Sequence, residues 1–290
     1  MDKNNVENFF HKGLEFFQKS NFSKAKYHFE KVLQIDPNNI KANHALGVLY
    51  GTTSEHEKAK DFFKQALKNK PDFLPSLYNL AISLIELEEF AESEAILQKL
   101  ITARPQDQNF YEKYVICLTK QSKFDSAEKF TEKLIKLNPL NPDSYKKMAL
   151  IKLNQKKYED SIPHFLKVLE LGRDETIKYY LGETFYNLKN YDKAISFFSE
   201  FLTISKNEKL IFSAKERLAR SFDEKKDYQK SIQLFKELEN QDLSMKDKVR
   251  ILASLSNVYI HMNEKDFDAD YSTGQYYAQE VLKIDQNNTL

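Results

Sequence analysis

Histidine, cysteine and glycine are the residues from which a metal site, a nucleophile or a phosphate-binding loop would be built. The histidines show no metal-ligand spacing such as H-E-x-x-H, so each is predicted to lie on a helix face. The six are His11, His28, His44, His56, His164 and His261. Cys117 lies between Ile116 and Leu118, and we interpret it as a small core residue rather than a nucleophile. Six scattered glycines do not form a phosphate-binding loop. The sequence therefore predicts no catalytic residue, no cofactor and no metal, and hence a protein that is not an enzyme.

One acidic segment is similar in part to a calcium-binding loop. It places Asp266, Asp268 and Asp270 at alternate positions. A calcium loop of this type needs a glycine at its sharp turn and a bidentate glutamate at its end. Tyr271 and Tyr277 occupy those two positions instead. We therefore predict an acidic, solvated loop rather than a calcium site.

The charge balance and the apolar pattern exclude several classes of protein. The chain has 44 basic and 43 acidic residues, and the two signs are interleaved, so no basic stripe for nucleic acid is present. No apolar run approaches the roughly 18 residues that suggest a membrane span. The segment MDKNNVENFF lacks the apolar region of a signal peptide, and a single cysteine is compatible with a reducing compartment. We expect a cytoplasmic protein that binds no nucleic acid and does not insert into a membrane.

The stretch from Ile40 to Phe73 carries a spaced pattern that recurs along the chain. Leu46-Gly47, Tyr50, Ala59, Phe63 and Pro71 follow the spacing L-G-x2-Y…A-x3-F…P. With Asn43 in place of its leading aromatic residue, this pattern resembles the tetratricopeptide repeat, whose period is about 34 residues. The resemblance covers nearly the whole chain.

The repeats divide the chain into eight successive units. Their predicted ranges are 6–39, 40–73, 74–107, 108–141, 142–174, 175–208, 212–245 and 249–288. The resemblance implies an all-α fold, a right-handed superhelical α-α solenoid of tandem helix-turn-helix repeats. We predict a single array over residues 6–288 without a separate catalytic domain.

Small residues are expected wherever two helices approach closely. Gly47 is predicted to lie at such an approach, and Ala59 to fill the matching position on the second helix of its repeat. Pro71 follows that helix and ends it. The position of Ala59 is small in all eight repeats: Ala25, Ala59, Ser93, Ala127, Ser161, Ala194, Ser231 and Gly274.

The family resemblance also implies a concave groove lined by the first helix of each repeat, at its second, fifth, ninth and twelfth positions. In repeats one to five these positions are largely apolar: Phe10, Leu14, Phe17, His44, Val48, Tyr78, Ile82, Ile85, Ile116 and Leu150. In repeats six and seven they are aromatic and charged: Tyr179, Glu183, Tyr186, Glu216, Arg220 and Asp223.

Two alternatives stay open for these side chains. Leu14, Val48, Ile82 and Ile116 can equally pack against the neighbouring hairpin, and the charged residues can form a solvated face. Phe17 and Tyr78 are the aromatic residues best placed to anchor a partner.

One subgroup of the family clamps the carboxylate at the C-terminus of chaperones with a lysine and an asparagine in one repeat. Lys146 supplies the lysine, but Leu150 occupies the asparagine position. Asn257 supplies the asparagine, but Ala253 occupies its lysine position. The clamp is incomplete, so we do not predict binding of chaperone tails.

Three functions are compatible with this pattern. The first is a non-enzymatic scaffold or adaptor that binds a peptide or an amphipathic helix of a partner protein in its groove. The second is the substrate-recruiting region of a larger enzyme, such as a glycosyltransferase or sulfotransferase. The third is self-assembly through the last repeat, where Tyr277, Val281 and Leu282 lack an obvious cover.

Overall fold

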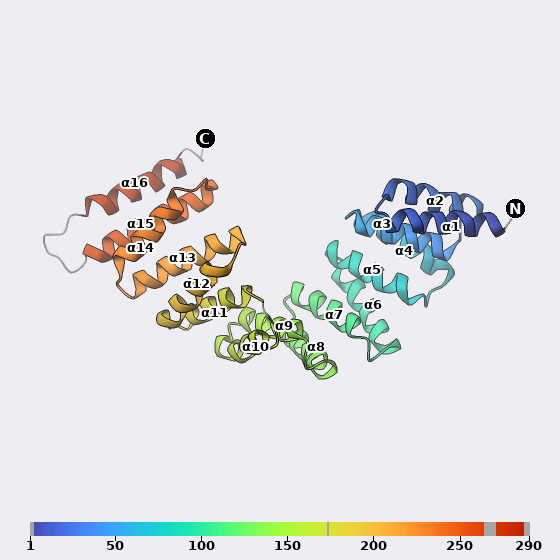
Figure 1. Cartoon of the computed structure of the whole chain (residues 1–290), viewed down its shortest axis with the longest axis horizontal. Helices are drawn as coiled ribbons and strands as arrows, with labels where there is room; N and C mark the ends of the chain where they lie inside the picture. Colours follow the sequence, from blue (N-terminus) through green and yellow to red (C-terminus); the bar gives the residue numbers. More distant parts are fainter. Residues whose placement is uncertain (1–2, 173, 264–270, 287–290) are drawn as a thin grey trace. The chain divides into compact units, whose positions relative to one another are not determined.

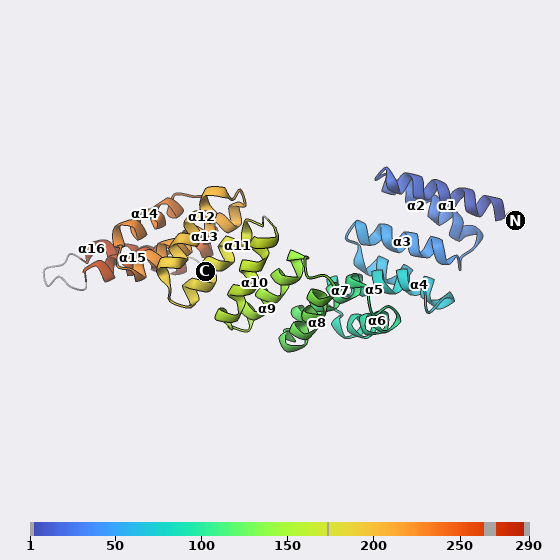
Figure 2. The same cartoon turned by 60° about the horizontal axis from the view of Figure 1, so that its bottom comes forward.

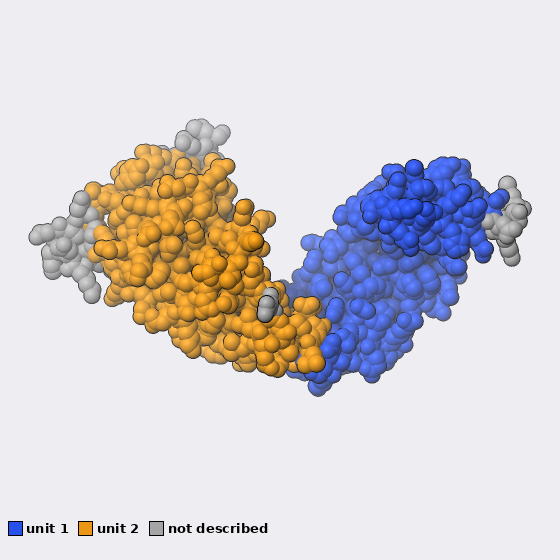
Figure 3. Space-filling model, viewed as in Figure 1, with its two compact units in different colours: residues 1–139 blue, residues 140–290 orange. Residues whose placement is uncertain are grey.

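The computed structural model describes residues 3–172, 174–263 and 271–286, and within them it contains sixteen α-helices and no strand (Figure 1). The chain divides into two compact units, unit 1 at Met1–Pro139 and unit 2 at Leu140–Leu290 (Figure 3). The division falls close to Pro142, the predicted start of repeat five. The all-α solenoid class predicted from the sequence is confirmed.

Each unit is a series of helical hairpins. Unit 1 contains α1 (Lys3–Gln18), α2 (Phe22–Ile35), α3 (Ile40–Thr52), α4 (His56–Asn69), α5 (Leu74–Glu86), α6 (Phe90–Ala103), α7 (Gln108–Lys120) and α8 (Phe124–Leu137). Unit 2 contains α9 (Pro142–Asn154), α10 (Tyr158–Leu171), α11 (Thr176–Asn187), α12 (Tyr191–Ile204), α13 (Glu208–Glu224), α14 (Tyr228–Glu239), α15 (Met245–Asn263) and α16 (Ser272–Gln286). Within each unit, the second helix of a hairpin contacts the first helix of the next one (Figures 1 and 2).

The hairpins turn in the same way because their first helices end alike. Seven of them end with a residue in the left-handed conformation, with φ between 56° and 64°: Ser20, Ser54, Glu88, Ser122, Lys156, Lys189 and Lys226. In the second hairpin, the N–H of Glu55 then donates to the carbonyl oxygen of Tyr50 at 2.8 Å. This pattern satisfies a carbonyl group at the helix end and reverses the chain within a few residues.

Gly47 lies where the sequence predicts a close approach. A Cβ atom there would lie 2.5 Å from Cε1 of Phe63, a ring that is fully buried. Gly13 meets Phe29 in the same way, at 2.4 Å, and Gly182 would meet Phe198 at 2.7 Å. The prediction for Gly47 is confirmed, and its cause is a phenylalanine ring that occupies the space of the missing side chain.

The position of Ala59 is buried throughout the chain. In the first seven repeats the exposed fraction of its residue is 0%, and Gly274 is buried in the eighth. A Cβ at Gly274 would lie 3.2 Å from Cγ1 of Ile260, tighter than normal van der Waals contact. The small size of these residues is therefore a packing requirement.

We expect Ala127→Leu to lower the free energy of unfolding by about 1–3 kcal/mol, because no space remains for the larger side chain. Lys129→Leu on the same helix, at an exposed position, should change stability by less than about 0.5 kcal/mol. Thermal melts of the two variants measure the difference. A melt of the Ala127→Leu variant that matches the native protein would contradict the packing.

Ser231 occupies the same small position, but its hydroxyl oxygen is buried and has no hydrogen-bond partner among the described residues. Ser93 differs, because its hydroxyl donates to the carbonyl oxygen of Ala81 at 2.9 Å. We expect Ser231→Ala to raise the free energy of unfolding by about 1 kcal/mol and Ser93→Ala to lower it by a similar amount. Urea unfolding of both variants tests this, and changes of the same sign would argue against it.

The inserted residues before repeat seven lengthen a helix rather than a loop. The sequence places the start of this repeat at Phe212, whereas α13 begins at Glu208 and is 17 residues long. Asn207 caps it, since its side chain accepts a hydrogen bond from the N–H of Leu210 at 3.2 Å. A good capping residue followed by helix-forming residues explains the earlier start.

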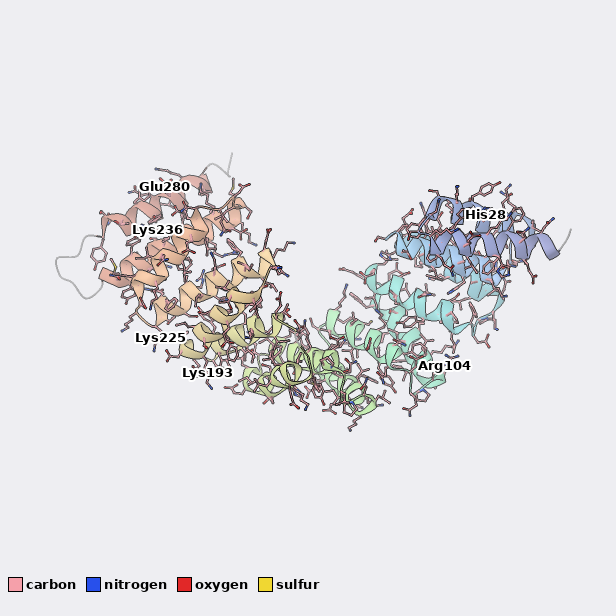
Figure 4. All side chains as sticks on the ribbon, viewed as in Figure 1. His28, Arg104, Lys193, Lys225, Lys236 and Glu280 are labelled. Atoms are coloured by element: carbon pink, nitrogen blue, oxygen red, sulfur yellow. The ribbon has the colours of Figure 1, made fainter. Side chains whose placement is uncertain are left out.

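Ion pairs join neighbouring hairpins near the molecular surface. Lys60 lies 2.6 Å from Glu89 in unit 1. In unit 2, Lys225, which Figure 4 labels, lies 2.9 Å from Asp192. Pairs near the surface typically contribute less than about 1 kcal/mol each, so buried packing is the main source of stability.

Candidate functional site

The first helices of successive hairpins adjoin one another within each unit. In unit 1, α3 contacts α5 and α5 contacts α7, and in unit 2, α11 contacts α13. The predicted groove residues lie on the first helices of the hairpins, α1, α3, α5 and α7 in unit 1 and α9, α11 and α13 in unit 2.

In unit 1 an apolar groove lies between α1 and α3. Its cavity has a volume of about 240 Å³. We call it the apolar groove; it is lined by Phe10, Leu14, Phe17, Phe29, Lys41, His44, Ala45, Val48 and Phe73. The structure thus brings together Phe10, Phe17 and His44, which the sequence assigned to the groove, with Leu14 and Val48 beside them.

His44 is held in this groove by one polar contact and two rings. Its Nδ1 lies 3.0 Å from Oγ of Ser76. Its ring centroid lies 5.4 Å from that of Phe73 and 5.7 Å from that of Phe63. Burial lowers the pKa of His44 below the usual value of a histidine, because a charged imidazolium loses hydration there. A neutral imidazole therefore belongs to the apolar lining.

A second and more polar cavity adjoins the first. Its volume is about 740 Å³, and it shares Phe10 and Lys41 with the apolar groove. The rest of its lining consists of Val6, Glu7, His11, Ile35, Asp36, Asn38, Asn39 and Ile40. Phe10 and Lys41 therefore mark the junction between an apolar and a polar part of one surface.

Three predicted residues on α5 lie outside both cavities. Tyr78 and Ile82 are half-buried, and the ring of Tyr78 packs on Phe110 with centroids 5.5 Å apart. Ile85 is 2% exposed and belongs to the core. A residue so deeply buried does not contact a partner, so Ile85 is left out of the proposed surface.

In unit 2 the predicted charges are paired with neighbouring helices. Oε1 of Glu183 on α11 lies 2.8 Å from Nε of Arg217 on α13. This is a charge contact without hydrogen-bond alignment, since the buried Glu183 oxygen has no aligned donor among the described residues. The Arg217 guanidinium also lies over the ring of Tyr186, at 4.9 Å, a favourable cation–π geometry.

Glu216 connects α13 to α15 in the same way. Its Oε1 lies 3.0 Å from Nη2 of Arg220 and 3.0 Å from Nε of Arg250. Arg220 also donates from Nη2 to Oγ of Ser254 at 3.0 Å. Glu216 is 8% exposed, so its charge is balanced by the two arginines rather than by water. We call Glu183, Arg217, Glu216, Arg220 and Arg250 the charged ladder.

Two further predicted residues lie beside the charged ladder. Oδ1 of Asp223 on α13 lies 3.1 Å from Nδ1 of His261 on α15. Burial raises the pKa of Tyr179 to about 12, with the nearby Glu183 carboxylate acting in the same direction. Burial also raises the pKa of Glu183, while Arg217 opposes this shift. The ladder is therefore a partly desolvated layer between hairpins.

Comparisons with known proteins agree with this arrangement of hairpins. The family model described as anaphase-promoting complex, cyclosome, subunit 3 matches residues 18–100, and the tetratricopeptide repeat model matches residues 146–209. The chain belongs to the tetratricopeptide repeat family. No curated protein matches it.

Solved structures show the same fold at low sequence identity. A tetratricopeptide repeat protein from Parabacteroides merdae has a TM-score of 0.67 and 15% identity, covering 87% of this chain and 99% of that one. PilF from Pseudomonas aeruginosa has a TM-score of 0.57 and 21% identity, covering 70% and 93%. MamA from Desulfovibrio magneticus has a TM-score of 0.56 and 14% identity, covering 58% and 94%. These tetratricopeptide-like structures support the fold alone.

Of the three arginines in the ladder of this tetratricopeptide repeat protein, Arg220 is predicted from the sequence, whereas Arg217 and Arg250 are not. Arg217 and Arg250 each follow the glutamate they pair with by one repeat period of about 34 residues. Opposite charges at one repeat period are a signal that the sequence does contain. Two opposite charges at this spacing face each other from successive first helices when both helices have the same rotation about their own axes.

Other predictions for the tetratricopeptide repeats concern the cysteine thiol, metal sites and membrane spans. Cys117 is fully buried, as predicted, and burial raises the pKa of its thiol. No group of three or more metal-binding side chains occurs in residues 3–172, 174–263 and 271–286. The acidic loop with Asp266, Asp268 and Asp270 lies outside these residues. None of the helices described is both long and apolar enough to cross a bilayer.

The apolar surface of the last hairpin differs from the expectation. Tyr277 is buried and stacks on Tyr259, with ring centroids 5.8 Å apart. Its neighbour Tyr276 is 55% exposed, and Leu282 is 58% exposed. Tyr277 therefore belongs to the core of the last hairpin, and Val281 packs against that core. On α16 the exposed apolar surface is formed by Tyr276 and Leu282.

Proposed function

We propose that this protein is a non-enzymatic scaffold that binds a segment of another protein on the first helices of unit 1. The apolar groove carries this proposal. Its aromatic and aliphatic lining is open to solvent, with Leu14 36% exposed and Phe10 and Phe17 half-buried. Grooves of this kind between helices suit apolar side chains of a partner, and aromatic residues supply much of the binding energy at interfaces.

The charged ladder has a different role in this proposal. Its glutamates and arginines already compensate one another across α11, α13 and α15. A partner would have to replace these contacts in order to use them, which reduces the gain from binding. We assign the ladder, Arg220 included, to the alignment of the hairpins in unit 2 rather than to partner binding.

The test uses two variants with the same chemical change. Leu14→Asp places a charge in the apolar groove, whereas Leu166→Asp alters an exposed leucine of α10, which is 48% exposed. Partners captured from the source cells are identified by mass spectrometry, purified and titrated against each protein. A partner bound by the native chain and the Leu166→Asp variant, but at least tenfold more weakly by the Leu14→Asp variant, supports the groove.

Equal affinity for all three proteins would place the binding surface elsewhere. The identity of the partner also separates the scaffold from the substrate-recruiting region of a larger enzyme. In the second case the captured protein would itself be chemically modified by that enzyme. Circular dichroism of both variants controls for loss of helical structure.

Self-association through the last hairpin is a second candidate, favoured by the exposed Tyr276 and Leu282 of α16. Light scattering over a concentration series tests it. A mass that rises with concentration and returns to that of a monomer in the Leu282→Lys variant supports the candidate. A native chain that is monomeric at high concentration excludes it.

A further inference from the structure

We infer that the apolar groove of unit 1 binds an amphipathic helix of the partner protein, and that a carboxylate beside the apolar face of this helix pairs with Lys41. This inference rests on the proposed function and makes it more specific. It names the conformation of the bound segment, the spacing of its apolar residues and the sign of one charge. Each of the three comes from a separate property of the groove.

The conformation follows from the scarcity of polar groups in the groove. Lys41 and His44 are the two lining residues with polar side-chain atoms, and Nδ1 of His44 is already in contact with Ser76. An extended peptide would bury backbone N–H and carbonyl groups against this lining without partners. A helix satisfies its backbone internally and presents side chains alone, so it fits an apolar groove better.

The spacing follows from the residues of α1 that form one wall. Phe10, Leu14 and Phe17 lie at positions i, i+4 and i+7, and Val48 lies four residues after His44 on the opposite wall. At a rise of about 1.5 Å per residue, Phe10 and Phe17 are separated by roughly two helical turns. A partner helix that packs its side chains between them needs apolar residues at i, i+3 or i+4, and i+7.

The charge follows from Lys41, which lies at the junction of the two cavities. Its side chain is exposed and has no ion pair or hydrogen bond to the rest of the described chain. It lies in the first turn of α3, where the helix dipole disfavours a cation. A carboxylate from the partner would compensate both the lysine and the dipole.

The acids of the adjoining cavity restrict where this carboxylate binds. Glu7 and Asp36 line the polar cavity. Their carboxylates would repel the carboxylate of the partner helix if it entered this cavity. The acidic residue of the partner helix is therefore placed at the junction beside Lys41. A basic residue elsewhere on the partner helix is accommodated in the polar cavity, near Glu7 and Asp36.

The experiment begins with a library of random 16-residue peptides displayed on phage and selected on the native chain. Selected sequences should share the i, i+3 or i+4, i+7 apolar pattern and an aspartate or glutamate beside it. A synthetic peptide from this set should become helical on binding, as measured by circular dichroism. A selected set without the acidic residue, or peptides that bind in extended form, would overturn the inference.

A charge exchange then tests the contact with Lys41. Fluorescence titration should show about tenfold weaker binding of the peptide to Lys41→Glu, and recovery when the acid of the peptide is replaced by lysine. Lys12→Glu is the matched control, because this exposed lysine of α1 lines neither cavity. Equal losses in the two variants would indicate a general charge effect and overturn the inference.

Failure of the inference is distinguishable from failure of the proposed function. If Leu14→Asp abolishes binding while Lys41→Glu does not, the groove binds its partner without the proposed carboxylate. If Leu14→Asp has no effect, or no sequence is selected, the groove itself is not the site. Binding that depends on Arg217 or Arg220 instead would assign the partner to the charged ladder.

Discussion

Gly47→Val is expected to destabilise unit 1 by about 3 kcal/mol. The added Cβ alone would lie 2.5 Å from Cε1 and 2.6 Å from Cδ1 of Phe63. Phe63 is 1% exposed, so its ring has no free space into which it could rotate. Overpacking of a buried site typically costs about 1–3 kcal/mol, and a β-branched residue adds atoms on both sides of the clash. Urea unfolding measures the loss.

Two further variants distinguish a clash from a general effect of replacing glycine in a helix. Gly51 lies on the same helix, but its Cβ would meet nothing closer than Cβ of Ala59 at 4.0 Å. Gly51→Ala should therefore stabilise unit 1 by about 0.5–1 kcal/mol, because alanine favours the helix. Phe63→Leu should restore part of the stability lost in Gly47→Val. A double variant less stable than either single variant would contradict the clash.

Glu216→Ala is expected to destabilise unit 2 by about 2 kcal/mol. The substitution removes the carboxylate that Arg220 and Arg250 share, on a residue that is almost fully buried. Breaking a fully buried ion pair costs about 3–5 kcal/mol. The arginines here have side chains 35% and 40% exposed, so part of their hydration is recovered and the loss is smaller.

The matched control is Glu237→Ala. Glu237 pairs with Lys215 at 3.1 Å, and its side chain is 42% exposed. Its removal should cost less than about 1 kcal/mol. A double-mutant cycle with Glu216→Ala and Arg250→Ala measures the coupling within the charged ladder. A coupling energy near zero would show that the two side chains do not stabilise each other.

Much of the fold is readable from the sequence because the tetratricopeptide pattern is local. The repeat that begins at Ile40 fixes two helices, and the spacing from Gly47 to Phe63 fixes how they cross. The starts of α3, α5, α7 and α9 coincide with the predicted starts of their repeats. Each of these features depends on contacts within one hairpin or with the next one, so neighbouring residues suffice to predict it.

The surface is less predictable, because exposure depends on the rotation of a helix and on what fills the space beside it. Ile85 and Phe17 both occupy groove positions of the repeat, yet Ile85 is buried whereas Phe17 lines a cavity. Likewise, the spacing of one repeat period from Glu216 to Arg250 indicates a pair, but the sequence does not reveal that Glu216 is only 8% exposed. These distinctions need coordinates.

The pairing of a glycine with a phenylalanine bears on how such a chain can change during evolution. Gly13, Gly47 and Gly182 each leave room for the ring of a phenylalanine on the second helix of the same hairpin. The third hairpin has Ala81 and Leu97 at the corresponding positions. The fifth and seventh hairpins have Ala149 with Phe165 and Ala219 with Phe235, all fully buried, so the same ring also packs in hairpins whose first helix carries an alanine. Because a Cβ at Gly47 would lie 2.5 Å from the ring of Phe63, a first helix with an alanine at this position fits only together with its own second helix, and we expect whole hairpins to be exchanged more readily than single helices.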